Sequence, residues 1–205
     1  MRDCCTCMTC GVRRCFNMNM DQKELARRIR MIVIDVDGTL SDGRFFVLPD
    51  GQQVKSFDVK DGTGIVFAGL AGIITAIITG KRSEAVRRRV EELGINEYYE
   101  GVHNKTMPFN ELLEKYDLSK EEVAYIGDDI GDAEVMGMVG FSAAVGDAHP
   151  LIKRISHFIA KRYGGRGAVR EVIDFILDAQ ERWPEIFVKL NSQENAEETL
   201  RKING

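Results

Sequence analysis

The stretch Met31-Ile32-Val33-Ile34-Asp35-Val36-Asp37-Gly38-Thr39-Leu40 decides the fold of this chain. Its first four residues are apolar and mostly β-branched, which predicts a strand buried on both faces of a parallel sheet. Because strand side chains alternate, Asp35 and Asp37 are expected on one side, just before a sharp turn that Gly38 permits. Open α/β sheets place active sites at the carboxyl ends of such strands, so both aspartates are candidate functional residues.

Length and composition fit one ordinary domain. The chain has 205 residues, of which 44% are hydrophobic, and its formal net charge is −4. The apolar content suffices for a sizeable core, and the negative charge does not suggest a nucleic-acid-binding protein. No apolar run reaches the ~20 residues that span a bilayer, and no signal-peptide core opens the chain. We therefore expect a cytoplasmic protein with no membrane or nucleic-acid partner.

The cysteines cluster at the beginning of the chain. All five lie among the first fifteen residues: Cys4, Cys5, Cys7, Cys10 and Cys15. The Cys4-x-x-Cys7-x-x-Cys10 spacing resembles iron–sulfur or zinc sites, but this segment has no aliphatic periodicity and no matching cysteine follows it. We expect residues 1–20 to be a disordered leader, or sequence upstream of a later true start.

Predicted strands and helices alternate after this leader. Strands are predicted at residues 73–79, 98–102, 123–126, 141–145 and 157–160. Helices are predicted at residues 21–30, 61–70, 83–93, 107–116 and 169–177, and a further helix follows Asp132 and ends near Val139. This alternation predicts an α/β, Rossmann-like three-layer sandwich with a mainly parallel sheet over residues 21–183. Two short apolar runs around Pro49-Asp50-Gly51 predict a β-hairpin insertion. Residues 184–205 are expected to form a polar C-terminal tail.

Chemically active side chains follow four of the predicted strands. They are Asp35 with Asp37, Thr79, Lys105, and Asp128 with Asp129 and Asp132. The carboxyl ends of parallel strands share one edge of a sheet, so these side chains are expected to converge. Carboxylate clusters suit Mg²⁺, and ammonium and hydroxyl groups donate to phosphate oxygens. The combination predicts phosphoryl transfer through an aspartyl-phosphate.

Each of these residues receives a role in that mechanism. Asp35 is the expected nucleophile, and Asp37 protonates the leaving alcohol and then takes a proton from water. Lys105 neutralises negative charge, and Thr79 donates to a phosphoryl oxygen. The expected Mg²⁺ ligands are Asp35, Asp37 and Asp128. Asp129 and Asp132 are expected to lie next to this site without binding the metal, where Asp132 can orient waters or Lys105.

These motifs resemble those of the haloacid dehalogenase superfamily. The matching stretches are Asp35-Val-Asp37-Gly-Thr-Leu, Ile77-Ile78-Thr79-Gly80, Lys105 and Gly127-Asp128-Asp129-x-x-Asp132. Further stretches resemble the 3-deoxy-D-manno-octulosonate 8-phosphate (Kdo 8-phosphate) phosphatase family: residues 57–62, 103–105, 145–150 and 164–171. The resemblance implies a Mg²⁺-dependent phosphatase that acts in making Kdo for bacterial lipopolysaccharide, and it implies a homotetramer.

The spacing of the motifs leaves no room for a cap domain over the site. Only 41 residues separate Asp37 from Thr79, and 22 separate Lys105 from Asp128. A capless fold must exclude water from its site by other means. The family resemblance implies that neighbouring subunits cover the site and that the hairpin packs them together.

The resemblance also implies a set of substrate contacts. They are Asp37, Asp58, Val59, Lys60, Asp61, Gly62, Lys81, Arg89 and Lys105. Basic residues among them suit a sugar-acid phosphate, which carries both a carboxylate and a phosphate. The glycine-rich stretch Gly164-Gly165-Arg166-Gly167 is interpreted either as a flexible link into the following helix or as a lid that reaches a neighbouring active site.

Three alternative functions are compatible with parts of this pattern. A related phosphatase can act on 9-phosphates of sialic-acid-like sugars. A signalling receiver domain also combines acids, threonine and lysine around Mg²⁺, but there the phospho-acceptor aspartate follows the acid pair on a middle strand, ahead of the threonine and lysine. A non-catalytic oligomerisation module of the same fold is expected to lose motif residues, and none is missing here.

Overall fold

A six-stranded sheet forms the middle layer of the protein. The computed structural model describes residues 21–192, so the cysteine-rich leader and residues 193–205 lie outside it. All strands of this sheet are parallel, in the order β5-β4-β1-β6-β7-β8. The strands are β1 (Met31–Ile34), β4 (Ile74–Thr79), β5 (Glu97–Glu100), β6 (Val123–Gly127), β7 (Phe141–Ala144) and β8 (Phe158–Ile159). The predicted parallel three-layer architecture is confirmed.

Strand β1 lies at the centre of the core. All four of its residues are fully buried, and they pair in register with β4 on one side and β6 on the other. A strand with neighbours on both edges and helices on both faces has no polar side, which explains its continuous apolar sequence. The chain therefore delivers Asp35 to the sheet edge where β4 and β6 also end.

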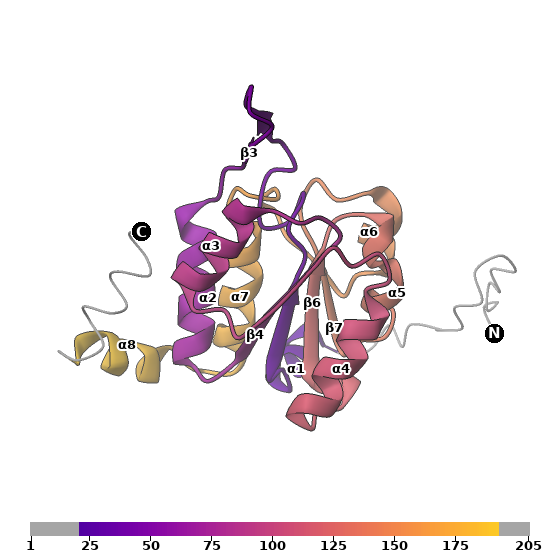
Figure 1. The fold of residues 1–205 in the computed structure, drawn as a ribbon. Coiled ribbons are helices and arrows are strands. Elements are labelled where there is room, and N and C mark those ends of the chain that lie inside the picture. Colours follow the sequence, from indigo (N-terminus) through magenta and orange to yellow (C-terminus); the bar gives the residue numbers. More distant parts are fainter. Residues whose placement is uncertain (1–20, 193–205) are drawn as a thin grey trace, which may run out of the picture.

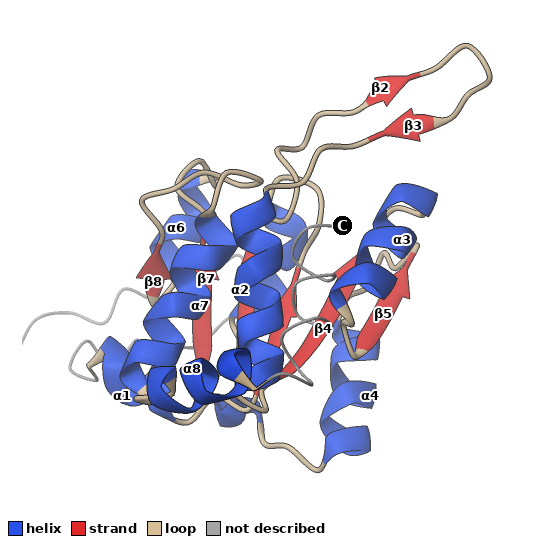
Figure 2. Ribbon diagram, turned by 90° about the vertical axis from the view of Figure 1, so that its left-hand side faces the viewer, coloured by secondary structure: helices blue, strands red, loops and turns tan. Residues whose placement is uncertain are grey.

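Helices cover both faces of the sheet (Figures 1 and 2). On one face lie α1 (Gln22–Arg27), α2 (Val59–Leu70), α3 (Glu84–Leu93) and α7 (Ala168–Ala179); on the other lie α4 (Thr106–Tyr116), α5 (Ala133–Met136) and α6 (Pro150–Ile155). Short 3-10 turns, η1 (Lys120–Glu122) and η2 (Ile130–Asp132), precede β6 and α5. None of the helices in the described part is long and apolar enough to cross a membrane.

Several helices differ from the sequence prediction, which contained no helix at the position of α6. Helix α2 begins two residues earlier than expected, because the Asp58 side chain accepts the backbone N–H of Lys60 and caps the helix. The polar-tail prediction is wrong for residues 184–191, which belong to helix α8 (Trp183–Asn191). Ile186 is fully buried, and Trp183 packs edge-on against Phe67 of α2 at 5.8 Å between ring centroids. Helix α8 therefore packs against α2, which is distant in the sequence.

The β-hairpin projects away from the sheet (Figure 2). Its strands, β2 (Phe46–Val47) and β3 (Gln53–Val54), pair antiparallel, which confirms the predicted hairpin around Pro49-Asp50-Gly51. The Phe46 and Val47 side chains are exposed in this single chain. The hairpin and α2 are the only elements between β1 and β4 in the described chain, so the predicted capless fold is confirmed.

A buried carboxylate joins α2 to α7. Asp61 is fully buried, and its two oxygens accept the backbone N–H groups of Gly167 at 3.0 Å and Arg170 at 2.8 Å. It therefore satisfies donors at the start of α7, which otherwise lack partners within the helix. Burial raises the pKa of Asp61 to about 6. The Asp61 carboxylate is therefore engaged within its own chain, and the implied substrate contact at Asp61 stays a prediction.

We expect Asp61→Asn to lower the free energy of unfolding by about 1–3 kcal/mol at pH 7, because an amide cannot accept from both N–H groups. The folded-state pKa of about 6 lies above the ordinary value of 3.8, so this group stabilises the wild type fully only below about pH 4. That contribution falls as pH rises through 6. The loss caused by the variant should therefore be larger at pH 4 than at pH 7.

Urea titrations of both proteins across this pH range measure the difference. The matched control is Asp117→Asn, at an exposed position with a φ of 49° that asparagine tolerates. A loss for Asp61→Asn that is independent of pH would contradict the argument.

Candidate active site

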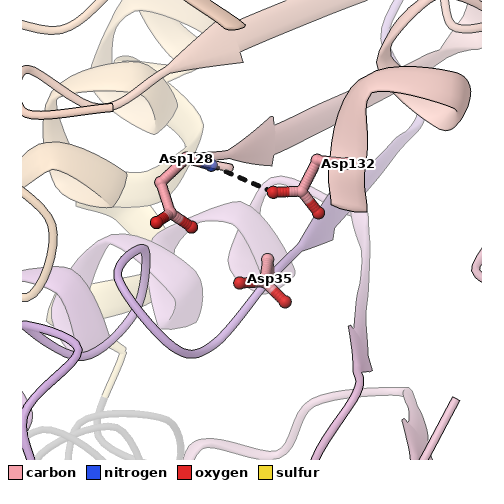
Figure 3. A group of neighbouring side chains, drawn as sticks. All are labelled: Asp35, Asp128 and Asp132. Atoms are coloured by element: carbon pink, nitrogen blue, oxygen red, sulfur yellow. Dashed lines mark hydrogen bonds between the residues drawn. The ribbon is translucent and has the colours of Figure 1, made fainter. Parts of the chain in front are cut away.

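Three carboxylates meet where β1 and β6 end (Figure 3). Asp35 follows β1, Asp128 follows β6, and Asp132 ends the turn η2. One carboxylate oxygen from each of them lies within 4.8 Å of the other two. The chain thus brings together acids from two of its motifs, as the parallel sheet predicts.

Lys105 joins two of these acids. Its ammonium donates to Asp35 Oδ1 at 2.5 Å and to Asp132 Oδ1 at 2.7 Å, and it reaches the cluster from the start of α4. The lysine side chain is only 10% exposed, so both ion pairs are largely shielded from water. Lys105 therefore lies where it can balance negative charge at Asp35.

Asp132 is held from several sides. Besides Lys105, it accepts the Tyr125 hydroxyl at 2.7 Å and the backbone N–H groups of Asp128 at 3.0 Å and Asp129 at 3.3 Å. Asp132 thus contacts both Lys105 and the loop after β6, and its expected supporting role stays a prediction. Sequence reasoning missed Tyr125, whose signal is a lone hydroxyl within a buried apolar strand.

The cluster carries excess negative charge. Burial, and then the Asp132 carboxylate, raise the pKa of Asp35 to about 6. Burial and Asp35 raise the pKa of Asp128 to about 7. Burial alone would lower the pKa of Lys105, but Asp35 and Asp132 outweigh it and raise that pKa. The Lys105 ammonium pairs with only two of the three acids, which leaves room for another cation, and a set of carboxylate oxygens fits Mg²⁺.

The loop after β1 supports Asp128. The Thr39 hydroxyl donates to Asp128 Oδ1 at 3.0 Å, a contact that the sequence did not predict. Gly38 has a φ of +96°, and a Cβ atom there would lie 2.1 Å from Asp128 Oδ2. Only glycine therefore lets the loop and this carboxylate approach so closely.

We expect Gly38→Ala to weaken Mg²⁺ binding by about tenfold or more, because the added methyl displaces the Asp128 carboxylate. Gly51→Ala is the matched control. Gly51 has a similar φ of +84° in the hairpin turn, but no atom lies within 4 Å of the position that a Cβ atom would take there. Isothermal titration of both substrate-free variants with Mg²⁺ separates backbone strain from this clash. Equal weakening in the two variants would contradict the role of the methyl group.

The Asp37 carboxylate lies outside the three-acid cluster. It forms an ion pair with Lys55, whose side chain is 1% exposed although it belongs to the hairpin's return arm. The position of the Asp37 carboxylate therefore does not support the prediction that Asp37 is a metal ligand. Sequence reasoning missed Lys55, because a lysine beside a hairpin strand ordinarily indicates a solvent-exposed side chain.

The remaining motif residues occupy the same edge of the sheet. Thr79 is buried at the end of β4, and its hydroxyl oxygen accepts the Lys81 backbone N–H at 3.5 Å. Lys81 is exposed, and its ammonium lies 5.1 Å from the Phe45 ring centroid at the hairpin. The Asp129 carboxylate accepts the Ile130 N–H at 2.8 Å and starts the turn η2, so it lies outside the acid cluster.

The implied substrate contacts around α2 divide into two groups. Val59 and Lys60 are exposed at the start of the helix. Gly62 is buried, and a Cβ atom there would lie 2.3 Å from a guanidinium nitrogen of Arg89. The Arg89 side chain is only 13% exposed and pairs with Glu92 at 2.7 Å. Gly62 and Arg89 thus form a packing contact between α2 and α3.

The glycine-rich stretch packs against the active-site loop of its own chain. The Gly165 N–H donates to the Thr39 carbonyl at 2.9 Å, and a Cβ atom at Gly164 would lie 1.7 Å from the Gly38 carbonyl oxygen. Arg166 is exposed and lies 4.0 Å from the Asp42 carboxylate. Gly164 and Gly165 thus support the loop after β1, and the two interpretations of this stretch, a flexible link and a lid over a neighbour, stay predictions.

Comparisons with known proteins agree with this geometry. A family model described as haloacid dehalogenase-like hydrolase matches residues 100–173. The 3-deoxy-D-manno-octulosonate 8-phosphate phosphatase of Escherichia coli is 45% identical over 163 residues, which cover 80% of this chain and 87% of that protein. This chain belongs to the Kdo 8-phosphate phosphatase family. The family resemblance inferred from the motifs is confirmed.

Solved structures in this phosphatase family share the fold. The Kdo 8-phosphate phosphatase of Yersinia pestis is 44% identical with a TM-score of 0.78, covering 79% of this chain and 88% of its own. That of Moraxella catarrhalis, in complex with magnesium ion, phosphate ion and a Kdo molecule, is 36% identical with a TM-score of 0.79, covering 83% and 98%. The predicted cofactor, Mg²⁺, agrees with the metal bound there.

Proposed function

We propose that this chain is a Mg²⁺-dependent phosphatase that hydrolyses Kdo 8-phosphate to Kdo and inorganic phosphate, in the route to bacterial lipopolysaccharide. The observation that carries the proposal is the buried pairing of Asp35 with Lys105 beside Asp128, at 2.5 Å between Lys105 Nζ and Asp35 Oδ1. This arrangement supplies a nucleophile, a fixed positive charge and an oxygen site for a metal.

The first chemical step is assigned to Asp35. One of its oxygens attacks phosphorus, an aspartyl-phosphate forms, and the bond from phosphorus to the sugar oxygen breaks. Lys105 holds Oδ1 and so leaves the other carboxylate oxygen to attack. Asp35 and Asp128 would hold the metal through their carboxylates. Bound Mg²⁺ supplies positive charge that offsets the repulsion between carboxylate and phosphate.

Proton transfer is assigned to Asp37, which stands apart from the metal cluster. It gives a proton to the departing sugar oxygen and then takes one from the water that attacks the aspartyl-phosphate. The phosphorus–oxygen bond to Asp35 breaks, and the free carboxylate returns. Thr79 donates its hydroxyl to a phosphoryl oxygen, since it lies buried at the same sheet edge.

Substrate selection is assigned to the exposed residues beside the site. Lys60 and Lys81 are exposed cations that suit the carboxylate of a sugar acid, and Val59 offers apolar surface beside them. The apolar hairpin supports the further proposal of a homotetramer, because exposed apolar patches mark protein interfaces; Phe46 is 74% exposed in the single chain. We also propose a cytoplasmic location.

A substrate panel tests the function. Wild-type protein with Mg²⁺ is given Kdo 8-phosphate, sialate 9-phosphates and simple sugar phosphates, and kcat/KM is measured from phosphate release. We expect the highest kcat/KM for Kdo 8-phosphate. A higher value for a 9-phosphate would reassign the substrate, and no release from any of them would favour a non-catalytic module.

A further inference from the structure

Lys55 is buried in a segment that is otherwise exposed. It follows β3 on the return arm, where burial alternates: Lys55 is buried, Ser56 is exposed and Phe57 packs against the core. Alternation of this kind places Lys55 and Phe57 on the inner face of an extended arm. A buried ammonium is costly unless it is paired, so its partner explains the position.

That partner is the side chain to which we assign proton transfer. Within the described residues, Asp37 is the only carboxylate that forms an ion pair with Lys55, and it does so through Oδ1. The other oxygen of Asp37 has no hydrogen-bond partner in the part of the chain that the structure describes. The Asp37 side chain is 21% exposed, so the protein covers it only in part.

The backbone at the hairpin base reinforces this link. Ser41 forms one bridge with Asp37 and a second, antiparallel bridge with Phe57 on the return arm. The loop that carries Asp37 is thereby joined to both arms of the hairpin. Lys55 lies two residues before Phe57, so the bridge between Ser41 and Phe57 also helps to fix the position of Lys55.

We propose that Lys55 is a positioning residue for the reaction. By holding one oxygen of Asp37, it directs the other toward the oxygen that leaves the phosphate, and it makes the hairpin part of the active site of its own chain. The inference rests on the proposed function, in which Asp37 moves the protons. A misplacement of about 1 Å in such a group can lower the rate by about 100-fold.

Two other roles for Lys55 make different predictions. A direct contact with the sugar acid would appear in KM for Kdo 8-phosphate. A purely structural role would reduce stability and lower activity regardless of what occupies position 37. Positioning acts through Asp37, so the effect of Lys55 must vanish once Asp37 can no longer transfer a proton.

The test is a double-mutant cycle in the full-length chain. The variants are Lys55→Met, Asp37→Asn and their combination, with Gln52→Ala as a control at an exposed position of the same hairpin. Phosphate release is followed under steady-state conditions with Kdo 8-phosphate and with p-nitrophenyl phosphate, whose leaving group needs no proton. Circular dichroism and light scattering report folding and assembly.

We expect Lys55→Met to lower kcat for Kdo 8-phosphate by about 10- to 100-fold. KM should change by less than about twofold, and p-nitrophenyl phosphate should lose less. In the Asp37→Asn background the same substitution should have no further effect, and Gln52→Ala should behave as wild type. If Lys55→Met does not fold, Lys55→Arg keeps the buried charge and should show a smaller kcat loss, also absent in the Asp37→Asn background.

Additive losses, a change in KM alone, or an unaffected kcat would each overturn the inference. Wild-type turnover separates this outcome from failure of the proposed function. If wild type prefers another phosphomonoester, the cycle is run with that substrate. A wild type inactive on every phosphomonoester would overturn both.

Discussion

Asp35→Asn is expected to abolish Mg²⁺-dependent phosphate release, lowering kcat by at least about 10⁴-fold. An amide is a poor nucleophile and cannot form the aspartyl-phosphate. The fold should persist, because burial and Asp132 raise the pKa of Asp35 to about 6 and so make its ionised form unfavourable in the metal-free protein. We therefore expect an unchanged or higher Tm for the variant without Mg²⁺.

The measurement is single-turnover phosphate release, combined with a thermal melt in the presence of a chelator. Asp117→Asn makes the same chemical change at an exposed helix end away from the acid cluster and should retain full activity. Mass spectrometry excludes deamidation back to aspartate. More than about 1% residual turnover in the verified Asp35→Asn protein would contradict nucleophilic catalysis by Asp35.

Lys105→Met is expected to have the second largest effect, with kcat lower by about 10³-fold. It also removes an ammonium that pairs with both Asp35 and Asp132, at 2.5 and 2.7 Å. Removing one partner of a buried ion pair leaves uncompensated charge, so we expect the free energy of unfolding to fall by about 3–5 kcal/mol at pH 7 without Mg²⁺.

This stability loss should depend on pH. Asp35 has a folded-state pKa of about 6, above its ordinary value of 3.8, and it protonates more readily once Lys105 is absent. Below about pH 5 a protonated Asp35 needs no cation, so the loss of stability should be smaller at pH 5 than at pH 7. Urea titrations at pH 7 and pH 5 in the presence of a chelator measure the two losses.

Lys115→Met provides a control on the same helix. Lys115 pairs with Glu97 at 2.6 Å, but its side chain is 56% exposed. Exposed ion pairs contribute about 0–1 kcal/mol, and this position is outside the acid cluster. Comparable losses of stability for the two lysine variants would show that Lys105 is not a buried charge partner.

The sequence by itself determined the sheet and the edge where the chemistry lies. The apolar run of β1 has no polar alternation, so it had to lie between two other strands, with Asp35 at its end. The order of strands and helices then brought Asp128 and Asp132 to the same edge. These features depend on local patterns and on the regular geometry of parallel sheets, which a linear sequence displays directly.

Only the tertiary structure decided which side chains meet around that edge. Thr39 reaches Asp128 across 89 residues, and Lys55 reaches Asp37 from a hairpin arm 18 residues away. Asp61, expected beside the substrate, caps the start of α7. Such contacts depend on loop packing and on helix positions that no residue spacing specifies. Buried polar groups are hydrogen-bonded, but the partner of each one becomes known only from the folded structure.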